Sequence, residues 1–245
     1  MLPFNKIHAC GNDFILVEEL PSKSDIQHLC NRNYGIGADG VMVFYPEEGQ
    51  FKLDHYDVDG SCSYCLNGAR SALSCLFQQG KVPVKGRFLN NGREVSYNIQ
   101  ASPCLYLERQ ICSRRLLSTS EGVIEGFFLD VGNPHFVILS GDLDRYCAVA
   151  SQIRHHESFR EGANVHLVQL NGSRWDIFSY ERGVEDFTLS CGSGTLAAAC
   201  VLFSERSLKS MVFNPQGEGE ILCEATQSQI VLSGSVSWVA QGVWR

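Results

Sequence analysis

The chain has 245 residues, of which 44% are hydrophobic and 19% charged, a composition that suits one large globular domain or two smaller ones. Its formal net charge of -7 disfavours a generic nucleic-acid binder, because phosphate contacts require basic side chains. No apolar run approaches the roughly 20 residues of a membrane span, and the N-terminus lacks the apolar core of a signal peptide. We therefore expect a soluble cytoplasmic protein with neither a nucleic-acid nor a membrane partner.

Short alternating or apolar runs predict strands along the whole chain. They cover residues 14–18, 41–45, 51–56, 94–99, 105–111, 123–129, 135–139, 165–170, 175–181, 211–214, 220–224, 229–232 and 237–243. Four helices are expected among them: residues 25–33 with Ser24 as N-cap, residues 142–153, a helix from Cys65 to Gly80, and a helix that follows Cys191. Many strands with few helices predict an α+β architecture.

The last two helices begin in the same way, each directly after a Cys-x-[Asn/Ser]-Gly sequence that follows strands and an acidic turn. Cys65 and Cys191 lie about half the chain apart. This internal repetition predicts two similar halves that face each other, with the polar segment 113–122 as their boundary.

The chain contains eleven cysteines, an odd number at scattered spacings, which argues against a disulfide framework. Most of them are expected to be small buried residues. Cys65 and Cys191 differ because the N–H groups at a helix start stabilise a thiolate and can hold a carboxylate. A single cysteine beside a glycine turn is usually structural, but two matched units could move an α-proton between two thiols.

Other patterns have weaker interpretations. Cys62-x-x-Cys65 resembles a redox or zinc pair but has no second pair or histidine pair at ligand spacing, and His155-His156 is expected to be exposed. The glycine pattern of residues 35–40 precedes a strand, whereas a dinucleotide loop follows one, so it predicts a turn from a helix into a strand. Gly11–Phe14, Gly132–His135 and Tyr180–Gly183 are either ordinary turns or parts of a site, and Arg182 could bind a carboxylate through two hydrogen bonds.

Taken together, these segments resemble diaminopimelate epimerase, a family of cofactor-independent racemases with two catalytic cysteines, nearly from end to end. The segments that carry the resemblance are Gly11–Phe14, Gly35–Gly40, Asp59–Ser61, Cys65–Arg70, Gly132–His135, Asn164, Glu181–Gly183 and Cys191–Gly194. The resemblance implies two pseudo-symmetric halves, each a curved mixed sheet around a central helix, with the active site in the cleft between them. The halves would be residues 1–112, with 236–245 returning as a strand, and residues 113–235.

The resemblance also implies an isomerase that interconverts LL- and meso-diaminopimelate for lysine and peptidoglycan synthesis, without cofactor or metal, on a small amino-acid substrate and in a homodimer. Cys65 and Cys191 would be the catalytic acid and base, with His135 and Glu181 beside the thiols. The implied substrate contacts are Asn12, Asp57, Leu66, Asn67, Asn133, Asn164, Glu181, Arg182, Gly192 and Ser193.

Three residues depart from the family pattern. Leu66 replaces a glycine, Asp57 replaces an asparagine, and Gly40 replaces a larger residue, which would widen the cleft. These departures leave open a racemase of a related amino acid such as glutamate. Outside this class, a thiol or metal-binding protein that uses Cys62 and Cys65 stays an alternative. A pyridoxal enzyme is disfavoured because no lysine stands in a convincing context.

Overall fold

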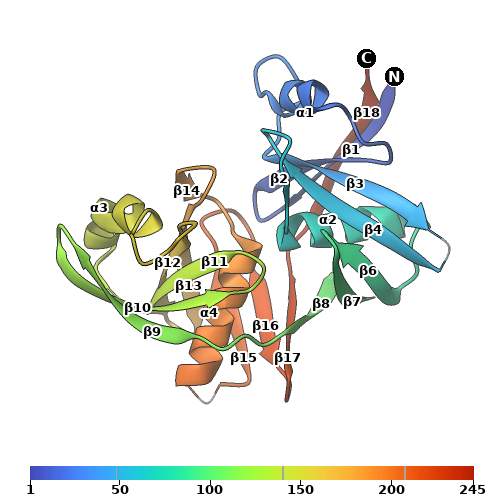
Figure 1. Ribbon diagram of the computed structural model, residues 1–245. Helices are drawn as coiled ribbons and strands as arrows, with labels where there is room; N and C mark the ends of the chain where they lie inside the picture. The colour runs from blue at the N-terminus through green and yellow to red at the C-terminus, as the bar shows by residue number, and fades with distance from the viewer. Residues whose placement is uncertain (48, 140, 207) are drawn as a thin grey trace. The chain divides into compact units, whose positions relative to one another are not determined.

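The strands pair into mixed sheets within two units of the chain. The computed structural model describes residues 1–47, 49–139, 141–206 and 208–245. Unit 1 comprises Met1–Tyr106 and Ser233–Arg245, and unit 2 comprises Leu107–Leu232 (Figure 1). The predicted α+β class with two similar halves is confirmed by the elements below.

Unit 1 contains a sheet in which neighbouring strands pair in the order β18-β1-β2-β3-β4-β6-β7-β8, with the short β5 also on β4. Of the pairs in this order, β2/β3 and β4/β6 are parallel. The strands are β1 (Leu2–Ala9), β2 (Asn12–Val17), β3 (Gly40–Glu47), β4 (Gln50–Asp57), β5 (Cys62–Ser63), β6 (Lys85–Asn90), β7 (Arg93–Ile99), β8 (Pro103–Glu108) and β18 (Ser237–Trp244).

Unit 2 repeats this order as β9-β10-β11-β12-β13-β15-β16, with the short β14 also on β13. The parallel pairs are again the third and the fifth, β11/β12 and β13/β15. The strands are β9 (Ser113–Thr119), β10 (Gly122–Asp130), β11 (Pro134–Leu139), β12 (Asn164–Asn171), β13 (Arg174–Glu181), β14 (Asp186–Thr188), β15 (Ser210–Asn214), β16 (Ile221–Ala225) and β17 (Gln229–Gly234). The internal repetition seen around the two cysteines therefore extends to the strand pairing of both units.

Each unit has one peripheral helix and one buried helix. The peripheral helices, α1 (Lys23–Cys30) and α3 (Leu143–Arg154), follow β2 and β11 and cross to the parallel partner strand. In unit 1, α2 (Leu66–Gln78) packs against β1, β2, β3, β4 and β18. In unit 2, α4 (Gly192–Glu205) packs against β10, β11, β12 and β16 and is buried from Gly192 to Phe203. A helix that is apolar all round must be covered on all sides, which is why α4 lies within its sheet.

Several boundaries differ from the sequence-based predictions. Helix α1 starts earlier than expected, because Ser22 and not Ser24 accepts the N–H of Asp25, and it ends at Cys30. Asp142 is the N-cap of α3 and lies just outside the helix. Strands β1, β5, β6, β9 and β14 were not predicted, and β9 occupies most of the segment 113–122. Residues 35–40 do form a turn that leads from α1 into β3, as predicted.

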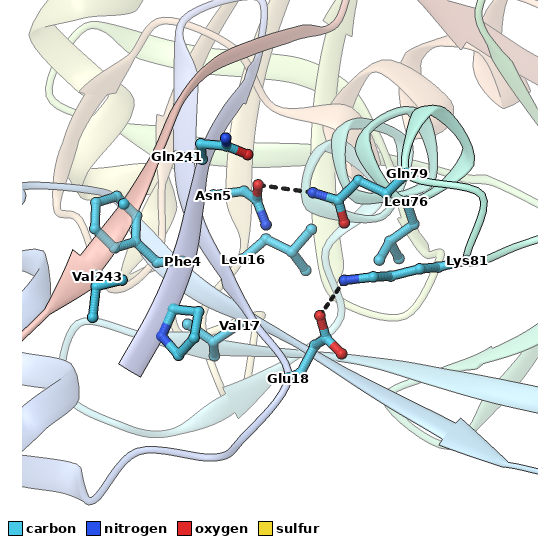
Figure 2. A pocket seen from close by; sticks show the side chains of 12 residues that line it. Phe4, Asn5, Leu16, Val17, Glu18, Leu76, Gln79, Lys81, Gln241 and Val243 are labelled. Carbon is cyan, nitrogen blue, oxygen red and sulfur yellow. Dashed lines mark hydrogen bonds and ion pairs between the residues drawn. The ribbon is translucent and has the colours of Figure 1, made fainter. Parts of the chain in front are cut away.

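A groove of about 430 Å³ lies at the C-terminal end of α2, between β1, β2 and β18 (Figure 2). Gln79 donates to Asn5 across it at 2.9 Å, and Lys81 pairs with Glu18 at its edge. Cys65 precedes the other end of α2, about 20 Å away along the helix. The groove is therefore separate from the cysteine motif. Within the described residues, no helix is long and apolar enough to cross a membrane.

Candidate active site

Cys65 is the N-cap residue of α2. Its backbone is extended, and its Sγ accepts the N–H of Gly68 at 3.3 Å. Asn90 of β6 donates to the carbonyl of Cys65 at 3.3 Å and fixes the cap from the sheet side. A Cβ on Gly68 would lie 2.4 Å from the Sδ of Met42, so the flexible Met42 side chain fills the space beside this glycine. The thiol is thus held at a helix N-terminus, where the N–H groups favour negative charge.

Three polar side chains line up beside this cap. Asn67 Nδ2 donates to Asn12 Oδ1 at 3.2 Å, and the buried guanidinium of Arg70 donates to Asn67 Oδ1 at 2.8 Å. Asn12 is placed by the tight β1–β2 hairpin, in which Cys10 and Gly11 both have positive φ values, of 50° and 88°. The predicted residues Asn12 and Asn67 therefore lie in contact, and Asn67 stands two residues after Cys65 in the chain.

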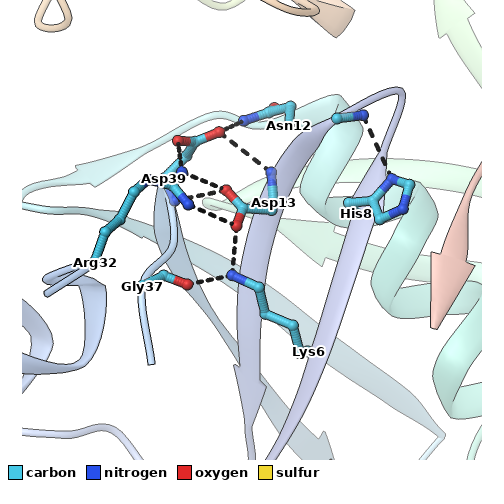
Figure 3. A network of polar contacts seen from close by, with 8 residues as sticks. Lys6, His8, Asn12, Asp13, Arg32, Gly37 and Asp39 are labelled. Carbon is cyan, nitrogen blue, oxygen red and sulfur yellow. Dashed lines mark hydrogen bonds and ion pairs between the residues drawn. The ribbon is translucent and has the colours of Figure 1, made fainter. Parts of the chain in front are cut away.

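Asn12 also belongs to a charged network at the start of β2 (Figure 3). It donates to Asp39 at 2.8 Å, Arg32 binds both oxygens of Asp13 at 3.1 and 2.8 Å, and Lys6 pairs with Asp13. The two cations hold the pKa of Asp13 below its usual value, against the effect of its burial. This network stabilises the loop that ends at Gly40 and carries Asp39.

Asp57 and Gly40 face each other at the ends of β4 and β3. The Asp57 side chain is 44% exposed, and its Oδ1 lies 3.8 Å from the buried ring of His55. Burial lowers the pKa of His55, so the carboxylate of Asp57 faces a neutral imidazole there. A Cβ on Gly40 would lie 2.2 Å from His55 Nε2. The expectation that Gly40 widens the site is therefore wrong, because the His55 imidazole fills that space.

Leu66 is the first residue of α2, and its side chain is 1% exposed and belongs to the core. Leu66 therefore replaces the family glycine without presenting a side chain to solvent.

In unit 2, Asn133 lies half-buried in the turn before β11, where its carbonyl accepts the N–H of Val131 at 3.2 Å.

Cys191 caps α4 as Cys65 caps α2, with Sγ accepting the N–H of Gly194 at 3.3 Å. The hydroxyl of Ser193 lies 3.6 Å from the same sulfur. Glu181, at the end of β13, hydrogen-bonds the Cys191 thiol and accepts from Thr188 of β14 at 2.5 Å. Ser193, Glu181 and the N–H of Gly194 thus contact the sulfur.

The pKa of the Cys191 thiol is raised well above its usual value. Burial is the main cause, followed by the negative charge of Glu181 and the hydrogen bond to it. The hydrogen bonds from Ser193 and the Gly194 N–H lower the pKa but do not compensate. The expectation of a lowered pKa at a helix start is therefore wrong for Cys191, which rests as a thiol, because desolvation outweighs the helix N-terminus.

His135 lies on β11, in register with Asn164 at the start of β12. Its Nδ1 is 2.8 Å from Nε2 of His166, whose Nδ1 is 2.9 Å from the hydroxyl of Ser179. Burial, followed by the neighbouring His166 and Arg182, lowers the pKa of His135 well below its usual value. Burial lowers the pKa of His166 to about 3. Both imidazoles are consequently neutral near pH 7.

Asn164 ties the end of β13 to the start of β11. Its Oδ1 accepts the backbone N–H of Arg182 at 2.8 Å, and its Nδ2 donates to the carbonyl of Pro134 at 3.3 Å. The guanidinium of Arg182 is 31% exposed and reaches the carbonyl of Glu161 at 3.5 Å. Asn164 and Arg182 are therefore adjacent, and Arg182 presents a half-exposed cation next to Glu181.

Sequence reasoning missed four polar residues of these two regions: Arg70, His166, Ser179 and Thr188. His166 lies in a strand that is buried on both faces, so alternation of polar and apolar residues gives no signal there. Alignment of the two halves of the sequence could have revealed it. His166 occupies the position that the apolar Met42 has in unit 1, and each side chain lies against the glycine of its cysteine motif. The change from an apolar to a polar residue at this position is the signal.

Comparison with known proteins places the chain in a family. A protein-family model described as diaminopimelate epimerase matches residues 127–239. A diaminopimelate epimerase of Aquifex aeolicus is 30% identical over 277 aligned positions that cover 98% of this chain and 97% of that protein. One of Methanothrix thermoacetophila is 35% identical, covering 82% of this chain and 80% of its own. The chain belongs to the diaminopimelate epimerase family. It is an isomerase, of a family that acts on a small-molecule substrate, and the prediction of this family is confirmed.

Solved structures support the fold. A putative phenazine biosynthesis protein of Clostridium difficile matches with a TM-score of 0.77 at 11% identity, covering 100% of both chains. A probable proline racemase of Agrobacterium radiobacter matches with a TM-score of 0.75 at 10% identity, covering 100% of this chain and 93% of its own. The fold of this chain is therefore shared with these two proteins.

Proposed function

We propose that the protein interconverts LL- and meso-diaminopimelate by moving the α-proton between the thiols of Cys65 and Cys191, as a step of lysine and peptidoglycan synthesis. The observation that carries this proposal is the matched pair of helix caps: each sulfur accepts the N–H of the glycine three residues later at 3.3 Å. Two such caps on one repeated fold supply two acid–base groups, which an epimerase that works without cofactor needs.

In the proposed reaction, the thiolate of Cys65 removes the α-proton and becomes a thiol. The electron pair passes into the substrate carboxylate, whose charge is stabilised by N–H groups at the helix starts, including those of Gly192 and Ser193. The thiol of Cys191 then gives its proton to the opposite face of the carbon and becomes a thiolate. The raised pKa of Cys191 supports its role as the proton donor in this direction. The reverse reaction exchanges the roles of the two sulfurs.

Within unit 2, Glu181 would hold the proton of Cys191 through its hydrogen bond, and His135 would act as a further polar group of the reaction. Asn12, Asn67 and Asn133 would contact the reacting amino-acid end. Asn164 and Arg182 would hold the far end. The assignment of the two halves of the active site to residues 1–112 with 236–245 and to residues 113–235 is part of this proposal, as is the absence of a cofactor.

Asp57 supports diaminopimelate over glutamate. Its carboxylate is 44% exposed and lies 3.8 Å from the ring of His55, where it could accept a hydrogen bond from a substrate ammonium. Diaminopimelate carries an ammonium group at both ends, whereas the far end of glutamate is a bare carboxylate that Asp57 would repel.

The test is incubation of the purified enzyme with LL-diaminopimelate in deuterated water, without added cofactor. We expect meso-diaminopimelate that carries deuterium at the inverted α-carbon. Absence of α-deuterium from both product and recovered substrate would reject the proposal. A parallel incubation with glutamate separates the alternatives, since faster deuterium uptake by glutamate would make it the main substrate. Cell fractionation and light scattering test the cytoplasmic location and the homodimer that we include in the proposal.

A further inference from the structure

A chain of hydrogen bonds in unit 2 ends at an unused nitrogen. It runs from Ser179 Oγ to His166 Nδ1 at 2.9 Å and from His166 Nε2 to His135 Nδ1 at 2.8 Å. The three side chains are 3%, 0% and 0% exposed. Beyond this chain, Nε2 of His135 is buried and has no hydrogen-bond partner among the residues that the structure describes. A buried polar atom without a partner points to a group that reaches it during function.

The neutral state of both imidazoles restricts the direction of these hydrogen bonds. A neutral imidazole carries one N–H, so the role of one ring nitrogen decides the role of the other. Either Ser179 donates to His166 and His166 donates to His135, or every bond runs the opposite way. The first arrangement leaves His135 with a proton on Nε2, and the second leaves a bare lone pair there.

The hydroxyl of Ser179 favours the first arrangement. In the second, its buried O–H would have no acceptor among the described residues, and His135 Nε2 would also lack a donor. In the first arrangement, Ser179 and His166 each donate to the next residue. The Nε2–H of His135 is then the one donor of the three residues left for an incoming group. Since buried donors in proteins are almost always used, the first arrangement is the more stable one.

We propose that His166 and Ser179 are positioning residues that hold His135 as its Nε2–H tautomer, so that His135 presents a hydrogen-bond donor to an anion. The anion would be an anionic sulfur or oxygen of the reaction, a thiolate or the carboxylate or enolate of the substrate. The assignment of that anion rests on the proposed function. The tautomer itself is a property of unit 2 alone.

The repeat indicates that the fold does not require the hydrogen bonds between Ser179, His166 and His135. At the matching register positions of unit 1, Phe14 stands in place of His135 and Met42 in place of His166. The imidazole of His166 lies against Gly194 as the thioether of Met42 lies against Gly68, with ring and sulfur atoms 2.2 and 2.4 Å from where a Cβ would be. The same backbone therefore accepts apolar side chains at both places.

Nitrogen NMR tests the tautomer directly. Protein labelled with ¹⁵N-histidine gives a long-range ¹H–¹⁵N spectrum in which a protonated and a bare ring nitrogen have well-separated shifts. The signals of His135 and His166 are assigned from their loss in H135F and H166M, which place in unit 2 the residue types that unit 1 already holds there. We expect Nε2–H for His135 in the wild type near pH 7.5, and a change to Nδ1–H or to a mixture in H166M. An Nδ1–H form in the wild type, or an unchanged tautomer in H166M, would overturn the inference.

Kinetics provide the second readout. H166M should lower kcat about tenfold and leave KM within about twofold, as expected when a residue that orients a catalytic group is lost. H166Q should recover most of the lost kcat, because an amide can accept from Ser179 and donate to His135 at the same time. Equal losses in H166Q and H166M, with both proteins folded, would contradict a positioning role. An enzyme with the expected tautomer that does not epimerise diaminopimelate would refute the proposed function and leave the tautomer assignment standing.

Discussion

At the residue scale, the two capping cysteines have different surroundings. Cys191 is 5% exposed and hydrogen-bonds Glu181, whereas Cys65 is half-buried and has Asn67 and Asn90 around its cap. The sequence was sufficient to select both cysteines, because the motif and the helix start are local. It was not sufficient for the pKa of Cys191, which depends on burial and on a carboxylate ten residues earlier that the β13–β14 hairpin brings back.

Replacement of Glu181 tests the origin of that pKa. In E181Q, the loss of the negative charge should lower the pKa of the Cys191 thiol, because charge repulsion no longer opposes the thiolate. Alkylation by iodoacetamide, followed at Cys191 by mass spectrometry across pH, should begin at a lower pH than in the wild type.

S193A is the matched control with the opposite sign, since the Ser193 hydroxyl lowers the pKa of Cys191. Its alkylation profile should move to higher pH. Profiles for E181Q and S193A that move in the same direction would contradict this description of the cap.

At the element scale, the helices that carry the motifs were predicted more accurately than the strands around them. Helices α2 and α4 begin directly after Cys65 and Cys191, as the motifs indicate. Strand β1 escaped prediction because its burial pattern does not alternate strictly; it forms because β18 and β2 pair with it on both sides. The pairing of β1 with β18 joins residues more than 200 positions apart, which no local window of sequence contains.

The glycines of the two motifs should respond differently to alanine. A methyl group at Gly194 would meet the rigid His166 ring at 2.2 Å, whereas one at Gly68 would meet the flexible Met42 side chain at 2.4 Å. We expect G194A to lower the free energy of unfolding by about 1–3 kcal/mol through overpacking. G68A should be nearly neutral, because methionine can adapt and alanine favours the helix.

Urea denaturation of both variants measures this difference. If G68A is destabilised as much as G194A, the contact between α4 and the rigid His166 ring is not the cause of the loss of stability in G194A. The double variant G194A/H166M gives a further check. It should regain part of the free energy of unfolding that G194A loses, because the flexible methionine can adapt to the added methyl group.

At the scale of the whole molecule, the repeated order of strand pairs explains why two half-chain motifs could be recognised from sequence. The strand that follows unit 2, β18, pairs with β1 and so belongs to unit 1. The buried histidines are a property of both units that sequence did not reveal: His55 in unit 1, and His135 and His166 in unit 2. Their burial is set by packing from several strands, which local polarity cannot report.

These histidines predict a loss of stability in weak acid. Each has a pKa below its usual value in the folded protein, so the unfolded chain binds protons that the folded one does not as pH falls below about 6.5. The stability that neutral His166 supplies is complete above that pH and declines between about 6.5 and about 3. Each such histidine should contribute about 1.4 kcal/mol per pH unit to the decline.

Urea denaturation between pH 4.5 and 7 measures this slope. In H166M, the slope of the free energy of unfolding against pH should be smaller than in the wild type by about 1.4 kcal/mol per pH unit, which corresponds to one proton fewer taken up on unfolding. An identical slope in both proteins would mean that His166 is protonated in the folded state.

The most direct test of the two-thiol account is the rate of LL-diaminopimelate epimerisation in deuterated water by C65S, C191S and C75S. Serine is a poor base near neutral pH, so C65S and C191S should each lose at least about 100-fold in rate while staying folded. C75S removes a buried thiol of α2 that the proposed reaction does not use, and it should lose stability and keep its rate. Either C65S or C191S with the rate of the wild type would contradict the account.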